Sequence, residues 1–116
     1  MISHTRPGIK YAELFEVMCN AYQSSGYGGE WHHHHQGGLS GYNTREVLLY
    51  PSNNLEVGIH QVFAWNPSIA GVKSEDTILV REGKTEILTY TGDYTYHSFE
   101  CNGQSILRPA IFIRSE

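Results

Sequence analysis

The clearest hydrophobic pattern in this chain is helical, and it follows the turn-forming segment Thr5-Arg6-Pro7-Gly8. From Tyr11 onward, apolar side chains recur every three or four residues, which places them on one face of a helix. Ser24-Ser25-Gly26 then ends the segment with a glycine stop. We therefore predict one long helix from Tyr11 to about Ser24. Its apolar positions are Leu14, Phe15, Val17, Met18, Ala21 and Tyr22.

The remaining sequence has the short apolar runs and turn signals of strands. Glu82-Gly83-Lys84 separates two such runs and predicts a hairpin. Gln36-Gly37-Gly38-Leu39 and Asn66-Pro67-Ser68 predict turns. Arg108-Pro109 interrupts the last run, which favours an edge strand or a bend there. The predicted strands are Val47–Tyr50, Gln61–Trp65, Thr77–Val80, Thr85–Thr89, Tyr94–Phe99 and Ile106–Ile113.

Together these elements predict one α+β domain over residues 1–116, with one long N-terminal helix packed on an antiparallel sheet. The formal charge of -4, with only 8 Lys plus Arg, argues against nucleic-acid binding. No apolar run approaches the roughly 20 residues that span a bilayer, and the N-terminus does not resemble a signal peptide. We therefore expect a cytoplasmic protein. Cys19 and Cys101 fit no metal-binding spacing and are expected to be two buried thiols.

Four consecutive histidines, His32 to His35, are the first candidates for chemistry. Imidazole is a common ligand of transition metals and titrates near neutral pH. In a strand, alternate side chains face opposite sides, so at most two of the four could share one pocket. We interpret His32 to His34 as part of a solvated or half-buried strand. His60 and His97 are single histidines in predicted strands, where a core or surface role is more common than a site.

Four segments resemble the pita-bread metallopeptidases, which include methionine aminopeptidase, Xaa-Pro aminopeptidase, prolidase and creatinase. His35-Gln36-Gly37-Gly38-Leu39 resembles the family's His-x-x-Gly-Leu segment, and Gln61 to Ile69 looks like its strand and Glu-Pro-Gly turn. Lys73 to Val80 looks like its Arg-x-Glu-Asp-Thr-Val-Leu-Val strand. Thr5 to Leu14 is similar to the segment that begins its helix. The order is the family's, over residues 5 to about 90, and an Xaa-Pro-aminopeptidase-like branch is the most similar. The resemblance implies the C-terminal half of a pita-bread fold, with a curved sheet.

Active members of this family bind two divalent metals through two aspartates, one histidine and two glutamates, and the metals generate a hydroxide nucleophile. By resemblance, His35 takes the place of the histidine and Glu75 that of the second, bridging glutamate. Asn66 stands where the first glutamate would be and is a poorer ligand for a hard cation. Tyr42 stands at the position of the family's substrate-facing histidine. No aspartate precedes Asp76, so both aspartate ligands are missing.

Two ligands out of five carry too little negative charge for two divalent ions. The resemblance therefore implies no metal in the isolated chain, and Mn, Co or Zn only when a missing N-terminal half completes the site. From the residues alone, Glu75 is better explained as a carboxylate hydrogen-bonded into the sheet, and Asp76 as a structural partner. The segment of Tyr42, Asn43, Arg45 and Glu46 could line a former substrate cleft or form a loop with a surface ion pair.

Three functions remain open. The chain could be part of an active Xaa-Pro aminopeptidase or dipeptidase that cleaves peptides once completed. It could be an inactive fragment that persists as a binding or structural module, which Asn66 and Tyr42 favour. It could also be an unrelated small protein that binds metal through its histidine run. Because a lone half would expose an apolar surface and a sheet edge, we expect either a homodimer or a complex with an N-terminal half.

Overall fold

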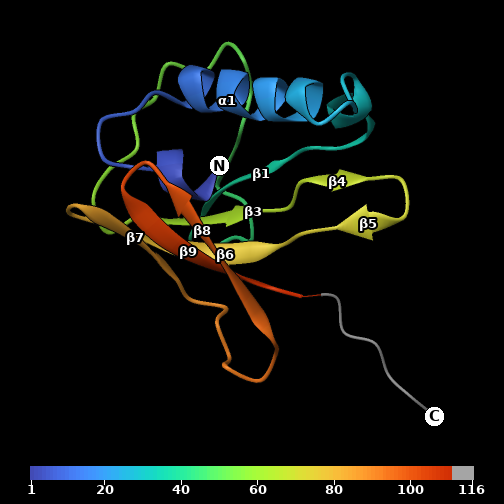
Figure 1. Ribbon diagram of the computed structural model, residues 1–116. Coiled ribbons are helices and arrows are strands. Elements are labelled where there is room, and N and C mark those ends of the chain that lie inside the picture. The colour runs from blue at the N-terminus through green and yellow to red at the C-terminus, as the bar shows by residue number, and fades with distance from the viewer. Residues whose placement is uncertain (111–116) are drawn as a thin grey trace.

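Helix α1, Tyr11–Ser24, lies across one face of a five-stranded antiparallel sheet in the computed structural model, which describes residues 1–110 (Figure 1). The buried side chains of α1 are spaced three or four residues apart and so form a single stripe facing the sheet. The predicted α+β class and the predicted helix are confirmed. The stripe consists of Tyr11, Leu14, Met18 and Tyr22.

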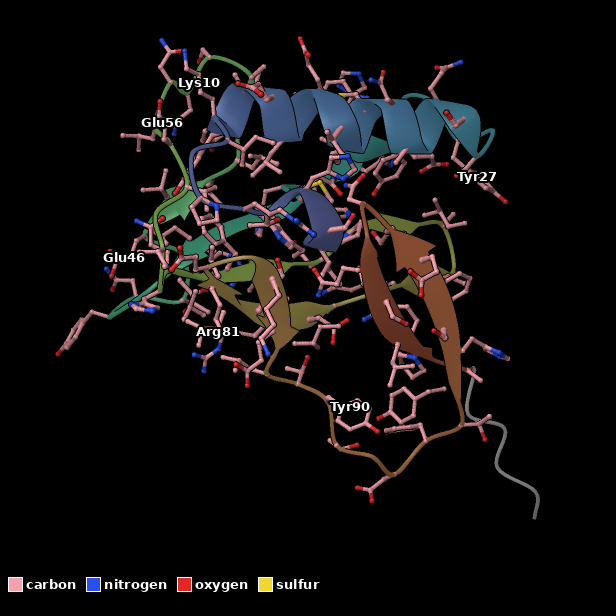
Figure 2. The ribbon with its side chains drawn as sticks, turned by 60° about the vertical axis from the view of Figure 1, so that its left-hand side comes forward. Lys10, Tyr27, Glu46, Glu56, Arg81 and Tyr90 are labelled. Atoms are coloured by element: carbon pink, nitrogen blue, oxygen red, sulfur yellow. The ribbon has the colours of Figure 1, made fainter. Side chains whose placement is uncertain are left out.

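The beginning of α1 is fixed by a neighbouring segment and not by a capping side chain. The Tyr11 N–H donates to the Leu55 carbonyl at 2.9 Å, and the Ala12 N–H donates to the Asn53 carbonyl at 3.1 Å. Figure 2 shows Lys10 and Glu56 beside each other at this end, where they form an isolated antiparallel bridge. These bonds satisfy amides that the first turn of a helix would otherwise leave without partners.

The sheet has the strand order β2-β1-β3-β6-β7, and each neighbouring pair is antiparallel. Phe63 and Trp65 of β3 and Ile78 and Val80 of β6 point into the core beneath α1, as alternation along a strand requires. The strands predicted from the apolar runs are confirmed, with slightly different ends. Their bounds are Gly37–Ser40 for β1, Val47–Leu48 for β2, Val62–Trp65 for β3, Asp76–Arg81 for β6 and Lys84–Ile87 for β7.

Strand β1 corrects the prediction of a turn at Gln36 to Leu39. It lies inside the sheet, paired with both β2 and β3. A Cβ atom at Gly37 would lie 1.9 Å from the Ala64 carbonyl oxygen, and one at Gly38 would lie 2.0 Å from the Val47 carbonyl oxygen. Gly37 also has a φ of 113°. The two glycines therefore allow a close approach of three backbones, and they do not form a turn.

Two ribbons extend the fold. Ser68–Ile69 (β4) and Val72–Lys73 (β5) form a short ribbon beyond the ends of β3 and β6, so the turn predicted through Ser68 ends one residue earlier (Figure 1). Tyr96–Cys101 (β8) and Gln104–Pro109 (β9) correspond to the last two predicted strands, and they pair as an antiparallel hairpin. Residues 111–113 of the last predicted strand lie outside the described residues.

The β8–β9 hairpin is attached to the sheet by polar side chains. Gln104 donates to the Thr85 carbonyl at 2.7 Å, and Arg6 donates to the Asn102 carbonyl at 3.1 Å. Cys101 is exposed on this hairpin, so the expectation of two buried thiols is wrong for it, whereas Cys19 is partly buried. Both thiols are free.

Over residues 1–110, the length and apolar character needed to cross a bilayer are found in none of the helices.

Candidate functional site

The histidine run begins in a 3₁₀ helix, Glu30–His33, which corrects the expectation of a strand. The His32 ring is exposed and stacks on the Trp31 indole, with 3.6 Å between the ring centroids. His33 is exposed and lies 3.9 Å from the Glu30 carboxylate. A short helix forms here because Gly29, at a φ of 93°, reverses the chain after α1. These two imidazoles are thus directed to solvent and to a neighbouring ring.

His34 is a structural residue at the point where the run enters β1. Its Nε2 atom is hydrogen-bonded to the Ser68 hydroxyl, and its carbonyl accepts a bond of 2.9 Å from the Gln36 amide. The same Gln36 side chain accepts a 2.8 Å bond from the buried Tyr22 hydroxyl. Burial raises the pKa of Tyr22, which keeps this hydroxyl protonated. The network connects α1, the histidine run and β4, and so it fixes where His35 emerges.

His35 is exposed, and its position is defined by the charges around it. Partial desolvation lowers the pKa of His35, electrostatic interactions with Arg45, His34 and Lys73 lower it further, and Glu75 opposes the shift. His35 and Glu75, which the sequence resemblance assigned to one site, therefore lie within electrostatic reach of each other. The lowered pKa favours the neutral imidazole, the form that can act as a ligand or accept a proton.

Glu75 is held by two cations. Its Oε2 atom lies 3.0 Å from Lys73 Nζ, and its Oε1 atom lies 3.7 Å from Arg45 Nη2. The Glu75 side chain is half exposed, and the Arg45 side chain is 17% exposed. The expected hydrogen bonding of Glu75 into the sheet is thus replaced by ion pairs at the end of the sheet.

Asn66 faces the same end of the sheet. The register pairs Trp65 with Asp76, so Asn66 and Glu75 are the next residues along the two strands. Asn66 is 7% exposed, and its backbone N–H donates to the Gln36 carbonyl at 3.0 Å. Among residues 1–110, the buried side-chain polar atoms without a hydrogen-bond partner are Asn66 Oδ1 and Arg45 Nε, one acceptor and one donor.

Asp76 is a structural partner, as the sequence suggested. Its carboxylate is hydrogen-bonded to Arg108 of β9 and accepts a 2.5 Å bond from the Thr89 hydroxyl. Arg108 also donates to the Ser74 hydroxyl at 2.7 Å. Asp76 lines a cavity of about 230 Å³ together with Met18 and other side chains from beneath the helix. It therefore attaches the C-terminal hairpin to the sheet, on the side of the sheet that α1 covers.

Tyr42, which the resemblance placed at the position of the substrate-facing histidine, has a fully exposed side chain in the loop between β1 and β2. In the same loop, the Glu46 carboxylate accepts bonds of 2.7 Å and 3.2 Å from Asn43, and these bonds lower the pKa of Glu46. Glu46 is thus bonded within its loop to a neutral amide, and the ion pair of Arg45 is made with Glu75, outside the loop. His60 is exposed in a turn at a φ of 65°, not in a strand, and His97 is exposed on β8.

The donor set does not fit a pair of divalent metals. Both Glu75 oxygens already face cations, and Asn66 adds no charge. In the part of the chain that the structure describes, no three His, Cys, Asp or Glu side chains gather as a metal site would require. The sequence did not predict that Lys73 takes part in this cluster or that Arg45 contacts Glu75. Lys73-Ser74-Glu75 could have indicated the first, because residues two apart on a strand share a face, but nothing local connects Arg45 to Glu75.

Comparison with known proteins supports a relation to peptidases. No family model matches the chain. An uncharacterized peptidase of Staphylococcus epidermidis is 30% identical over 93 residues, which are 76% of this chain and 26% of that protein. An uncharacterized peptidase of Staphylococcus aureus is 33% identical over 94 residues, with 77% and 27% covered.

A solved structure has the same fold. The crystal structure of a dipeptidase from Pyrococcus horikoshii OT3 is similar with a TM-score of 0.64 and 26% identity, over 77% of this chain and 26% of that one. About three quarters of the chain is therefore similar to a segment of peptidases, which confirms the resemblance found in the motifs. The chain spans about a quarter of the length of the relatives it matches.

Proposed function

We propose that this chain is a peptidase-like domain that neither holds a metal nor hydrolyses peptides by itself. The observation that carries this proposal is the state of Glu75, whose two oxygens are engaged by Lys73 and Arg45. Its neighbour on the facing strand, Asn66, is neutral. A pair of metals needs several carboxylates to offset four positive charges, and His35 with Glu75 supplies one.

The remaining capacity of the domain is binding. Tyr42, which resemblance placed opposite the substrate, has a fully exposed side chain, and this position does not favour the stabilisation of a tetrahedral intermediate at Glu75. An accessible cavity of about 370 Å³ lies between α1 and the histidine run, lined in part by Trp31 and His35. A concave, largely apolar surface with a few polar groups is suited to a peptide segment. We therefore favour a binding or structural module over a peptidase that is complete in this chain.

A second candidate is an active peptidase in which other chain segments complete the site. The length of the similar peptidases favours it, because this chain matches only about a quarter of each. His35 and Glu75 would then be the residues of this chain that hold Mn, Co or Zn, and the metal would supply the Lewis acidity that peptide hydrolysis needs. Glu75 would have to exchange its pairing with Lys73 and Arg45 for the metal.

Peptide hydrolysis assays on the chain, treated with chelator and then supplied with Mn²⁺, Co²⁺ or Zn²⁺, separate these functions. Xaa-Pro and Met-Xaa peptides are suitable substrates. We expect no turnover above that of a Glu75→Gln variant prepared identically, because the site lacks ligands and not merely the ion. Metal-dependent turnover that the variant lacks would refute the proposal and establish the second candidate.

We further propose that the domain pairs with a second copy of itself or with an N-terminal peptidase half. Several large apolar side chains near the β8–β9 hairpin are about half exposed, which is the surface a partner would cover. They include Leu88, Tyr90, Tyr94 and Phe99, and Figure 2 shows Tyr90 on the loop that leads to the hairpin. Light scattering is expected to give the mass of a dimer for the isolated chain, and a monomer at high concentration would contradict self-association.

Two free thiols favour the cytoplasm as the setting of this protein.

A further inference from the structure

Two cations from separate elements of the chain contact the Glu75 carboxylate. Arg45 reaches it from the loop between β1 and β2, and Lys73 reaches it from β5. With Arg45, Lys73 and Glu75 charged, the cluster has a net charge of +1 before any ion arrives. The cluster therefore repels a divalent cation and does not attract one.

The two cations differ in how firmly they are held. The Arg45 side chain is 17% exposed, and its Nη1 atom donates to the Thr44 carbonyl at 2.9 Å. Lys73 is 53% exposed but has the shorter contact, 3.0 Å from Glu75. Arg45 is thus a fixed charge beside the carboxylate, and Lys73 is a closer charge on a freer side chain.

Asn66 places a neutral amide, and not a carboxylate, at this end of the sheet. Its unpartnered Oδ1 acceptor and the unpartnered Arg45 Nε donor are both buried, and both belong to residues that face or contact Glu75. An amide oxygen can accept from a guanidinium without adding charge. Asn66 therefore adds a buried acceptor at this end of the sheet without adding negative charge.

We propose that Arg45 and Lys73 are built-in counter-cations of Glu75 that close this site to divalent metals. The proposal deepens the proposed function, on which it rests for the importance of Glu75, because it names what takes the electrostatic place of a metal. Removing these charges should convert the site into a weak cation site, since Glu75 and His35 would remain as ligands.

The test is calorimetric titration of the whole chain with Mn²⁺ at low salt, in wild type and in the double variant Arg45→Gln/Lys73→Gln. Mn²⁺ is the probe because it prefers oxygen ligands over the soft or imidazole-rich sites that the histidine run could offer to other metals. A divalent ion roughly 6 Å from a unit charge in water loses about tenfold in affinity to it. We therefore expect Mn²⁺ affinity to rise about a hundredfold in the double variant, and about tenfold in Lys73→Gln alone.

Two controls make the gain specific. Arg81→Gln removes the cation of another Arg–Glu pair of the same sheet, Arg81 with Glu86, and should leave Mn²⁺ affinity unchanged. Arg81 lies at the far end of β6, as Figure 2 shows. Adding Glu75→Gln to the double variant should abolish the gain. Lys73→Gln replaces an exposed side chain, so it is informative even where the double variant does not fold.

The outcomes separate this proposal from the proposed function. Stoichiometric Mn²⁺ binding by wild type without hydrolysis would overturn the counter-cation proposal and the metal-free part of the proposed function, but not the absence of hydrolysis. Hydrolysis by wild type would overturn the proposed function. Unchanged affinity in Lys73→Gln and in the folded double variant, or a gain that survives loss of Glu75, would overturn the counter-cation proposal. A gain that requires Glu75, in a variant that still does not hydrolyse peptides, supports both.

Discussion

Glu75 and Asp76 are adjacent carboxylates with opposite surroundings. Asp76 is 13% exposed and is bonded to Arg108 and Thr89 on the side of the sheet that α1 covers. Glu75 is 50% exposed and pairs with Lys73 and Arg45 at the sheet end. One peptide step along a strand reverses the direction of the side chain. The same chemical group therefore forms a structural ion pair at one position and an exposed ion cluster at the next.

The contrast is energetic as well as geometric. An ion pair withdrawn from water leaves an uncompensated charge when one partner is removed, whereas an exposed pair is replaced by hydration. The Asp76–Arg108 pair also joins β9 to β6, two elements 32 residues apart in sequence. Loss of Asp76 should thus loosen the hairpin, whereas loss of Glu75 should leave the fold intact.

Asp76→Asn is the substitution that tests this contrast with the largest effect. Breaking a fully buried ion pair costs about 3–5 kcal/mol, and partial exposure of Arg108 reduces the expected loss to about 2 kcal/mol. Urea unfolding followed by circular dichroism measures it. An Arg108→Gln variant should be destabilised by a comparable amount, and the double variant by less than the sum, because both lose the same interaction.

Glu75→Gln is the matched control one residue away. We expect its free energy of unfolding to lie within about 0.5 kcal/mol of wild type, as for other exposed pairs. The two amide substitutions are equally conservative in shape, so a difference between them reports the environment alone. Equal costs at positions 75 and 76 would show that the division between a structural and a site carboxylate is wrong.

The sequence predicts the elements whose signals are local. The three- and four-residue spacing from Tyr11 to Tyr22 defines α1 and its buried face, and the apolar runs locate β3, β6 and β7. The predicted turn at Gln36 to Leu39 was wrong because glycine has two uses. It permits turns, and it also permits backbones to approach closely, as at Gly37 and Gly38. Local sequence does not distinguish them.

The site shows the same limit. Motif order was enough to bring His35 and Glu75 into one neighbourhood, because His35 precedes β1 and Glu75 precedes β6, and both strands are neighbours of β3. It did not reveal that Arg45 would occupy the space beside Glu75, 30 residues away in sequence. The role of Tyr42 stays a prediction, since its side chain is fully exposed and a loop position inherited from a motif does not determine where the loop directs its side chain.

Titration of His35 gives the smallest but most local test of how the Glu75 cluster differs from the Asp76 pair. Desolvation is the largest cause that lowers the pKa of His35, followed by Arg45, while Glu75 raises it. Nuclear magnetic resonance of the ring protons should therefore give a midpoint below the ordinary value of 6.5. Arg45→Gln should move the midpoint upward but not fully to that value, because desolvation remains. Glu75→Gln should move it further down.

The lowered pKa of His35 also determines how folding stability changes with pH. Because the pKa of His35 is lower in the folded chain, the unfolded chain binds more protons as the pH falls through 6.5, and the contribution of His35 to stability decreases over that range. Arg45→Gln should reduce this loss, and Asp76→Asn should not affect it, because Asp76 is not among the charges that shift His35. If Asp76→Asn moved the His35 midpoint as much as Arg45→Gln does, the two carboxylate environments would be coupled, and the separation of the two faces of the sheet would not hold.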